Sequence, residues 1–123
     1  MKITNPINSH KYLVHACLEG PEEGVYYRGS AKILPENDSV KVSVPSYTKK
    51  WFDFTVQITP IFNHNNLLKT QLFTSEVENN SFTVFGENCK FFWIVHGKRH
   101  DITVEPFKND VNVKGDGPYK WIN

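Results

Sequence analysis

The densest group of chemically versatile side chains in this chain lies between Tyr12 and Gly29. It contains a histidine, a cysteine, three glutamates and one of the two arginines: His15, Cys17, Glu19, Glu22, Glu23 and Arg28. Residues two apart on a strand project to the same face, so His15 and Cys17 could form half of a metal site or a thiol–imidazole pair. No C-x-x-C pairing supplies the missing ligands. We therefore predict neither a metal, a cofactor nor a catalytic thiol.

The glutamates offer a second kind of chemistry. Two carboxylates are the minimal apparatus of a glycoside hydrolase, so Glu19 and Glu22 with His15 form a candidate hydrolase site. Carboxylates in a turn are usually solvated, however, and Arg28 is a natural bidentate partner for one of them. We expect a structural clamp in which Arg28 holds Glu19 or Glu22, and no enzymatic activity.

Two apolar runs must position these residues. Residues 12–18 are apolar on both faces, which predicts a buried strand, and residues 25–34 predict a second strand. Residues 19–24 contain a Gly-Pro pair and predict the turn between them. We call a set of six residues from this stretch the hairpin motif and expect it to support the fold: His15, Cys17, Glu19, Glu22, Tyr26 and Arg28.

Length and composition indicate a single strand-rich domain. The chain has 123 residues, of which 14% are aromatic, and aromatic and β-branched residues favour strands. A net charge of +1 with scattered lysines argues against a nucleic-acid partner. No apolar run approaches the roughly 18 residues of a membrane span, so we expect no membrane insertion. Residues 1–11 lack periodicity and predict an arm or linker, and residues 12–123 predict the domain.

The pattern along the chain predicts eight or nine short strands and little or no helix. Alternation is clearest in residues 39–44 and 52–61. The other expected strands are residues 67–74, 81–85, 90–96 and 101–107. The single candidate helical turn spans residues 46–51, with Ser46 able to cap it. The fold class is therefore an all-β, antiparallel β-sandwich of jelly-roll-like type.

Residues 90–96 have apolar side chains on both faces and predict a strand buried on both sides. His96 and His100 are expected to lie on either side of a turn at residues 97–99. Cys17 and Cys89 each lie in an apolar run, where a free thiol behaves as a small core residue, so we expect both to be reduced.

Three aromatic residues are candidate ligand contacts. Tyr47, Trp51 and Trp121 each lie close to lysine, and aromatic rings at such positions can stack on sugars. The same positions are equally typical of a core rim or a subunit contact. Both interpretations remain open.

The stretch KYLVHACLEGPEEGVYYRG, with the later KVSVPSYTKKWFDFTVQITP and KFFWIVHGKRHDITVEP, resembles a β-rich domain of virion surface and fibre-type proteins of large DNA viruses and phages. The resemblance extends to about Pro106 and is most specific in the first stretch. It implies a non-enzymatic virion structural or attachment module that forms a homotrimer in the virion. A host surface glycan or receptor is the further partner that it implies.

Strands that are apolar on both faces fit this expectation, because a symmetric oligomer buries the surplus apolar surface. Two other functions stay open. One is a carbohydrate- or receptor-binding module that uses Tyr47, Trp51 or Trp121. The other is a hydrolase that uses Glu19, Glu22 and His15.

Overall fold

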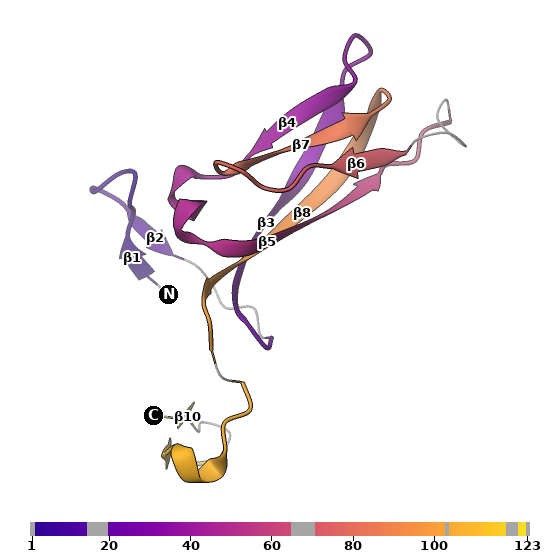
Figure 1. Cartoon of the computed structure of the whole chain (residues 1–123). Coiled ribbons are helices and arrows are strands. Elements are labelled where there is room, and N and C mark those ends of the chain that lie inside the picture. The colour runs from indigo at the N-terminus through magenta and orange to yellow at the C-terminus, as the bar shows by residue number, and fades with distance from the viewer. Residues whose placement is uncertain (1, 15–19, 65–70, 103, 118–120, 123) are drawn as a thin grey trace.

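Two three-stranded antiparallel sheets pack face to face, which confirms the expected all-β sandwich (Figure 1). The computed structural model describes residues 2–14, 20–64, 71–102, 104–117 and 121–122. The first sheet has the order β3–β8–β5, with β3 spanning Glu23–Ile33, β8 Cys89–His100 and β5 Phe52–Pro60. The second has the order β4–β7–β6, with β4 spanning Ser39–Ser43, β7 Ser81–Gly86 and β6 Leu72–Thr74.

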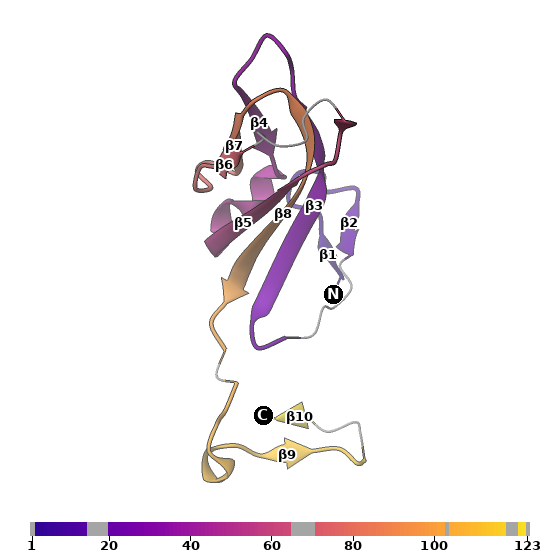
Figure 2. The same ribbon diagram turned by 90° about the vertical axis from the view of Figure 1, so that its right-hand side faces the viewer.

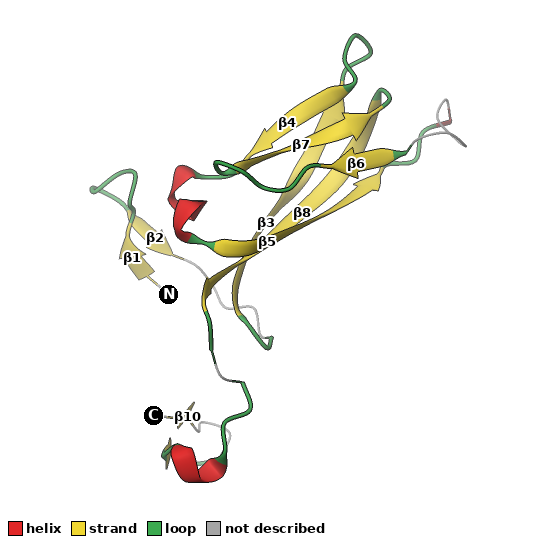
Figure 3. Cartoon of the chain, viewed as in Figure 1, coloured by secondary structure: helices red, strands yellow, loops and turns green. Residues whose placement is uncertain are grey.

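The described chain contains four further short strands and short 3-10 helices (Figure 3). The strands β1 (Lys2–Thr4) and β2 (Tyr12–Val14) pair with each other, as do β9 (Val113–Lys114) and β10 (Trp121–Ile122). The helix η1 spans Ser46–Lys50, and η3 spans Lys108–Asp110. Strands therefore dominate the described structure, as the alternating sequence predicts.

The core lies between the two sheets. In β3 every second residue faces inward, ending at the fully buried Ile33. The same alternation in β7 and β8 buries Phe82, Val84, Phe91 and Val95. Burial of each such side chain contributes about 1.5–3 kcal/mol. This apolar contact holds the two described sheets together. Cys89 is a free, buried thiol, as predicted. Cys17 lies outside the described residues.

The central strand β8 pairs with β3 on one side and with β5 on the other. The prediction that this strand is buried on both faces is wrong at Phe92, whose side chain is 57% exposed. A sandwich of two layers covers only the inner face of each sheet, so nothing in the described chain covers the outer face of β8 at Phe92. Only the inward-facing positions are fully buried.

The strand β8 also continues past the predicted turn. Residues 97–100 extend the strand to His100, which pairs with Glu23 of β3. Pairing on both sides overrides the local turn signal, and Gly97 is buried where a Cβ atom would lie 2.8 Å from the Phe54 ring. The turn between His96 and His100 and the strand expected over residues 101–107 are therefore both wrong for the described residues.

The predicted N-terminal hairpin is wrong in its described part. The strand β2 pairs with β1, where Lys2 lies opposite Val14, whereas β3 pairs with β8. Residues 1–11, expected to be an arm or linker, thus contribute a strand. The long partner β8 offers β3 a complete ladder of hydrogen bonds, which the short strand β2 does not. Residues 15–19 lie outside the described chain.

Two segments stand apart from the sandwich, and we call them the terminal arms. The N-terminal arm is the β1–β2 hairpin, which joins neither sheet. The C-terminal arm comprises the described residues from 104 onward and extends away from the sandwich in both views (Figures 1 and 2). Large apolar side chains are exposed on both arms: Ile7, Tyr12, Val14, Val104, Phe107 and Val113. Phe107 is 80% exposed.

The helical turn expected after β4 is confirmed as η1, but Ser46 does not cap it. Pro45 occupies the N-cap position, and no side-chain capping bond is made. Within η1, Thr48 is fully buried, and its Oγ1 atom has no hydrogen-bond partner among the described residues. A buried hydroxyl without a partner costs about 1–3 kcal/mol.

We therefore expect Thr48→Val to raise the free energy of unfolding by about 1 kcal/mol, because valine keeps the shape of threonine without its buried hydroxyl. Thr48→Ala should lower it, because alanine also leaves a cavity. Urea unfolding of the two variants measures both effects. A loss of stability in Thr48→Val would show that the hydroxyl contributes a favourable hydrogen bond.

Candidate binding surfaces

Only half of the hairpin motif lies in the described chain. His15, Cys17 and Glu19 lie outside it, so the structure does not test the hydrolase site that includes them. Tyr26 and Arg28 lie on the exposed face of β3. Glu22 directly precedes this strand. The described half of the motif therefore lies along one strand and does not span a hairpin.

Lys98, and not Arg28, is the partner of Glu22. The Nζ atom of Lys98 lies 3.7 Å from Glu22 Oε1 and 3.2 Å from Asp53 Oδ2. The expected Arg28 clamp on Glu22 is therefore wrong, while its alternative with Glu19 lies outside the described residues. In place of the clamp, Lys98 of β8 bridges two carboxylates from the segments on either side of this strand: Glu22, which precedes β3, and Asp53 of β5.

The register of the sheet explains this exchange of partners. Lys98 lies opposite Gly24, at the end of β3 where Glu22 precedes the strand. Arg28 lies opposite Ile94, further along the same strand. Each residue of a strand advances the chain by about 3.3 Å, which places Arg28 too far from Glu22 for a direct ion pair.

A bulge in β5 brings Asp53 to Lys98. The register between β5 and β8 shifts between Phe52 and Thr55, and Asp53 has a φ of 58°. Aspartate tolerates this left-handed conformation better than most residues, and a bulge re-aims the side chains around it. The hydrogen bond with Asp53 and the nearby negative charges raise the pKa of Lys98, although partial desolvation opposes this.

We expect Lys98→Met to lower the melting temperature more than Arg28→Met does. Removal of Lys98 leaves two carboxylates near each other without their shared cation, whereas Arg28 is an exposed residue of the outer face. Thermal unfolding at low and at high salt measures this difference, which should shrink at high salt because salt screens the charges. Equal melting temperatures at low salt would contradict the bridging role of Lys98.

The predicted ligand contacts Tyr47 and Trp51 belong to an aromatic cluster with Tyr27. The Tyr27 and Trp51 rings are stacked with centroids 6.0 Å apart, and Tyr47 meets Trp51 edge-on at 6.0 Å. The hydroxyl groups of Tyr27 and Tyr47 are hydrogen-bonded. All three residues are half-buried, so the cluster forms a rim of the core. A role of Tyr47 and Trp51 in ligand binding stays a prediction, and the side chain of Trp121 lies outside the described structure.

Burial of the Tyr27 hydroxyl raises its pKa well above the usual range for tyrosine, and the hydrogen bond to Tyr47 raises it further. The unfolded chain releases this proton near pH 10.0, whereas the folded chain retains it to higher pH. The resulting contribution to stability is therefore complete below pH 10.0 and is lost as the pH rises through the folded pKa.

We expect the stability of the protein to fall as the pH rises above about 10, and to fall less steeply in Tyr27→Phe. Phenylalanine keeps the ring contacts but has no proton to release. Urea unfolding at about pH 8 and about pH 11 measures the difference, with the exposed Tyr12→Phe as the control. Identical pH dependence in Tyr27→Phe and the native protein would refute this role of the Tyr27 proton.

The outer face of the β3–β8–β5 sheet carries a partly apolar, partly basic surface, which we call the outer patch. Its residues are Tyr26 and Arg28 of β3 with Phe92, Ile94 and His96 of β8. The Tyr26 and His96 rings are 6.3 Å apart. In the register of the sheet, Tyr26 lies opposite His96 and Arg28 opposite Ile94. The outer patch is therefore one continuous surface across two strands.

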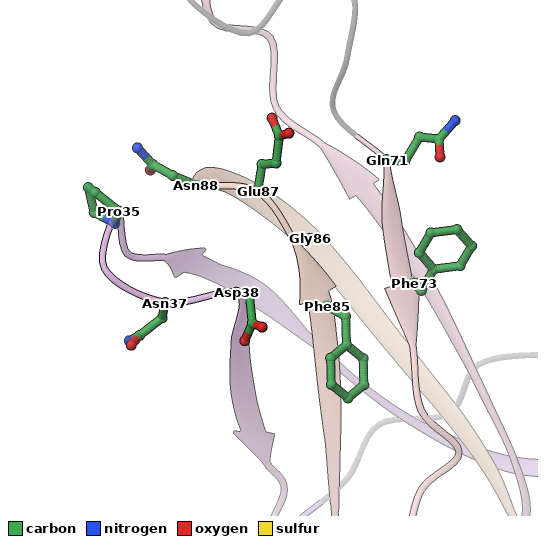
Figure 4. A pocket seen from close by; sticks show the side chains of 9 residues that line it. All are labelled: Pro35, Asn37, Asp38, Gln71, Phe73, Phe85, Gly86, Glu87 and Asn88. Carbon is green, nitrogen blue, oxygen red and sulfur yellow. The ribbon is translucent and has the colours of Figure 1, made fainter.

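The second sheet carries a different surface, an open cleft with a volume of about 710 Å³ at one end of β7 (Figure 4). Two loops, the start of β6 and the end of β7 line this cleft. The lining residues are Pro35, Asn37, Asp38, Gln71, Phe73, Phe85, Gly86, Glu87 and Asn88. We call it the phenylalanine cleft.

Two phenylalanines on neighbouring strands form the apolar part of the phenylalanine cleft. Phe73 of β6 lies directly opposite Phe85 of β7, and their side chains are 65% and 46% exposed. Gly86 permits the close approach of the strands, because a Cβ atom there would lie 2.6 Å from Leu72 Cδ2. The Gly86 N–H donates a hydrogen bond to the Asp38 carbonyl oxygen at 2.9 Å, which joins the loop after β3 to β7.

No motif in the sequence points directly to this cleft. Alternation in residues 81–85 places Phe82 and Val84 inward and therefore Phe85 outward. The turn signals at residues 35–38 and 86–88 also mark the two loops. The local patterns do not predict that β6 pairs with β7 in the register that places Phe73 opposite Phe85.

Two further features would indicate other classes of site, a metal-binding cluster and a membrane-spanning helix. Within the described ranges, no group of three or more histidine, cysteine, aspartate or glutamate side chains could hold a metal ion. Among the helices of that part of the chain, none is long and apolar enough to cross a membrane.

No family model matches this chain, and comparisons with curated proteins and with solved structures give no match either.

Proposed function

We propose that this chain is a non-enzymatic assembly domain that associates with further copies of itself. The terminal arms are the observation that carries the proposal. Each contains a two-stranded sheet that joins neither sheet of the sandwich, and an isolated two-stranded hairpin is at best marginally stable in water. Packing of an arm against another copy would supply the apolar contact that the hairpin lacks within its own chain.

The exposed side chains of the arms support the same proposal. Tyr12 and Val14 of the N-terminal arm and Phe107 and Val113 of the C-terminal arm are all exposed. Exposed apolar groups that cluster on one segment are typical of interaction surfaces, whereas single scattered ones are not. The burial of four such side chains in another copy would contribute several kcal/mol, at about 25 cal/mol per Å².

The outer patch is the natural surface to receive an arm. Phe92 and Ile94 supply apolar area on β8, and Tyr26 extends it across β3. Aromatic residues and arginine are enriched at protein interfaces, and Arg28 flanks this apolar area. An arm of one copy on the outer patch of the next copy gives a heterologous contact, and such a contact closes into a trimeric ring when each copy is rotated by about 120° from the last.

We further propose that the assembly is a homotrimer and that it belongs to a virion. This proposal is supported by the resemblance of residues 11–29 to virion surface and fibre proteins. A structural or attachment module of this kind needs stable self-association and no catalytic centre. Two observations thus agree: the two-stranded arms lack stabilising contacts within their own chain, and residues 11–29 resemble proteins that assemble in virions.

The oligomeric state tests the proposal. We expect native mass spectrometry and sedimentation velocity to give a trimer for the full chain. The double substitution Phe107→Ser and Val113→Ser should shift it to monomer, because it removes the apolar surface of the C-terminal arm. Phe62→Ser, which changes an exposed phenylalanine of a sandwich loop, is the matched control and should leave the trimer intact.

A native chain that stays monomeric at high protein concentration would refute self-assembly. A trimer that survives both arm substitutions and also Phe92→Ser would show that neither the C-terminal arm nor the outer patch forms the contact.

A further inference from the structure

The phenylalanine cleft combines flat apolar surface with amide and carboxylate side chains. Phe73 and Phe85 lie opposite each other on neighbouring strands and are exposed, although β6 and β7 also carry inward residues that pack in the core. Exposure of two large aromatic rings side by side is unusual for surface that only meets water, and such patches mark binding sites. The rings offer a ligand two apolar faces within one cleft.

The polar lining consists of amides and carboxylates. Asn37, Gln71 and Asn88 supply three amide side chains, and Asp38 and Glu87 supply two carboxylates. A side-chain amide both donates and accepts hydrogen bonds, and a carboxylate accepts them strongly. A ligand hydroxyl also both donates and accepts, so this lining matches a ligand that carries many hydroxyl groups.

Charge narrows the class of ligand further. Among the residues that the structure describes, the lining contains two carboxylates and no lysine, arginine or histidine. Phosphate, sulfate and carboxylate groups are recognised mainly by arginine, lysine and backbone N–H groups, and two carboxylates would repel them. A nucleic acid would also need cationic contacts to its phosphates. The described lining therefore disfavours an anionic ligand, and its amides and apolar rings match the hydroxyl groups and C–H faces of a neutral sugar.

We propose that the phenylalanine cleft binds a neutral carbohydrate. The C–H face of a sugar ring is flat and apolar and packs on Phe73 and Phe85, while its hydroxyl groups hydrogen-bond to the amides and carboxylates that line the cleft. A volume of about 710 Å³ lies within the range of roughly 300–1,000 Å³ that small-ligand sites occupy. This volume suits a short oligosaccharide.

The backbone holds the cleft in its shape before a ligand arrives. Phe73 and Phe85 lie within paired strands, and the Gly86 N–H is hydrogen-bonded to Asp38. On the other side, the Asn37 N–H donates to the Leu34 carbonyl oxygen at 3.0 Å. A site built on paired strands and hydrogen-bonded loops loses little conformational entropy when the ligand binds.

This site is independent of the proposed self-assembly. The phenylalanine cleft lies on the β4–β7–β6 sheet, whereas the outer patch lies on the opposite face of the sandwich. Sugar binding can therefore fail while assembly holds, and the reverse can also occur.

An array of neutral, sialylated and sulfated glycans, probed with the full chain, tests the proposal. We expect neutral glycans to be retained and charged ones to be rejected. Titration of one retained neutral oligosaccharide should then show that Phe73→Ala and Phe85→Ala each weaken binding by about tenfold, since each removes one stacking surface. Phe62→Ala changes an exposed phenylalanine that is not among the described residues lining the cleft and is not part of the outer patch, and it should leave the affinity unchanged.

Nuclear magnetic resonance on the native protein makes the test independent of how the variants fold. The same oligosaccharide should shift the amide signals of Phe73, Phe85 and Gly86 and leave those of the outer patch in place. The proposal is overturned if the array retains no glycan or only charged ones. It is equally overturned if both phenylalanine substitutions leave the affinity unchanged, or if the shifted signals lie on the other sheet.

Discussion

The two-sided pairing of β8 is the constraint on which the rest of the structure depends. This strand is held by β3 along one edge and by β5 along the other, and its inner face supplies Phe91 and Val95 to the core. The second sheet closes over that face with Phe82 and Val84. Because the inner face of β8 meets the core, its alternate residues meet solvent, and this fixes where the outer patch lies. Because β8 is long enough to include Lys98, this residue lies beside the carboxylates of two neighbouring segments.

Local pattern was enough to predict the fold class and most of the sandwich strands. Alternation in residues 39–44, 52–61 and 81–85 is a local property, and the corresponding strands β4, β5 and β7 form there. The choice of partner is not local. The expected pairing of residues 12–18 with residues 25–34 follows from their closeness in sequence, but β3 pairs with a strand whose partner residues lie between 56 (Ile33 to Cys89) and 77 (Glu23 to His100) positions away. Long-range pairing also overrides the turn signal before His100.

The candidate sites were harder to predict than the fold, for the same reason. Arg28 and Glu22 are close in sequence, but the strand separates them in space, and Lys98 from β8 takes the place of the arginine. The phenylalanine cleft is assembled from three separate segments of the chain: residues 35–38, 71–73 and 85–88. Each segment has a recognisable local signal, a turn or an outward aromatic residue. Their juxtaposition depends on the register between β6 and β7, which no local pattern contains.

The bulge at Asp53 has a consequence for how copies of this chain can meet. The strand β5 lies at the edge of its sheet, where unpaired N–H and C=O groups can recruit a further strand. A shifted register and a left-handed residue at one end of β5, and Pro60 without an N–H at the other, leave only a short regular edge between them. Stacking of sheets edge to edge without limit is thereby disfavoured. The molecule is in this way protected against aggregation along the β5 edge.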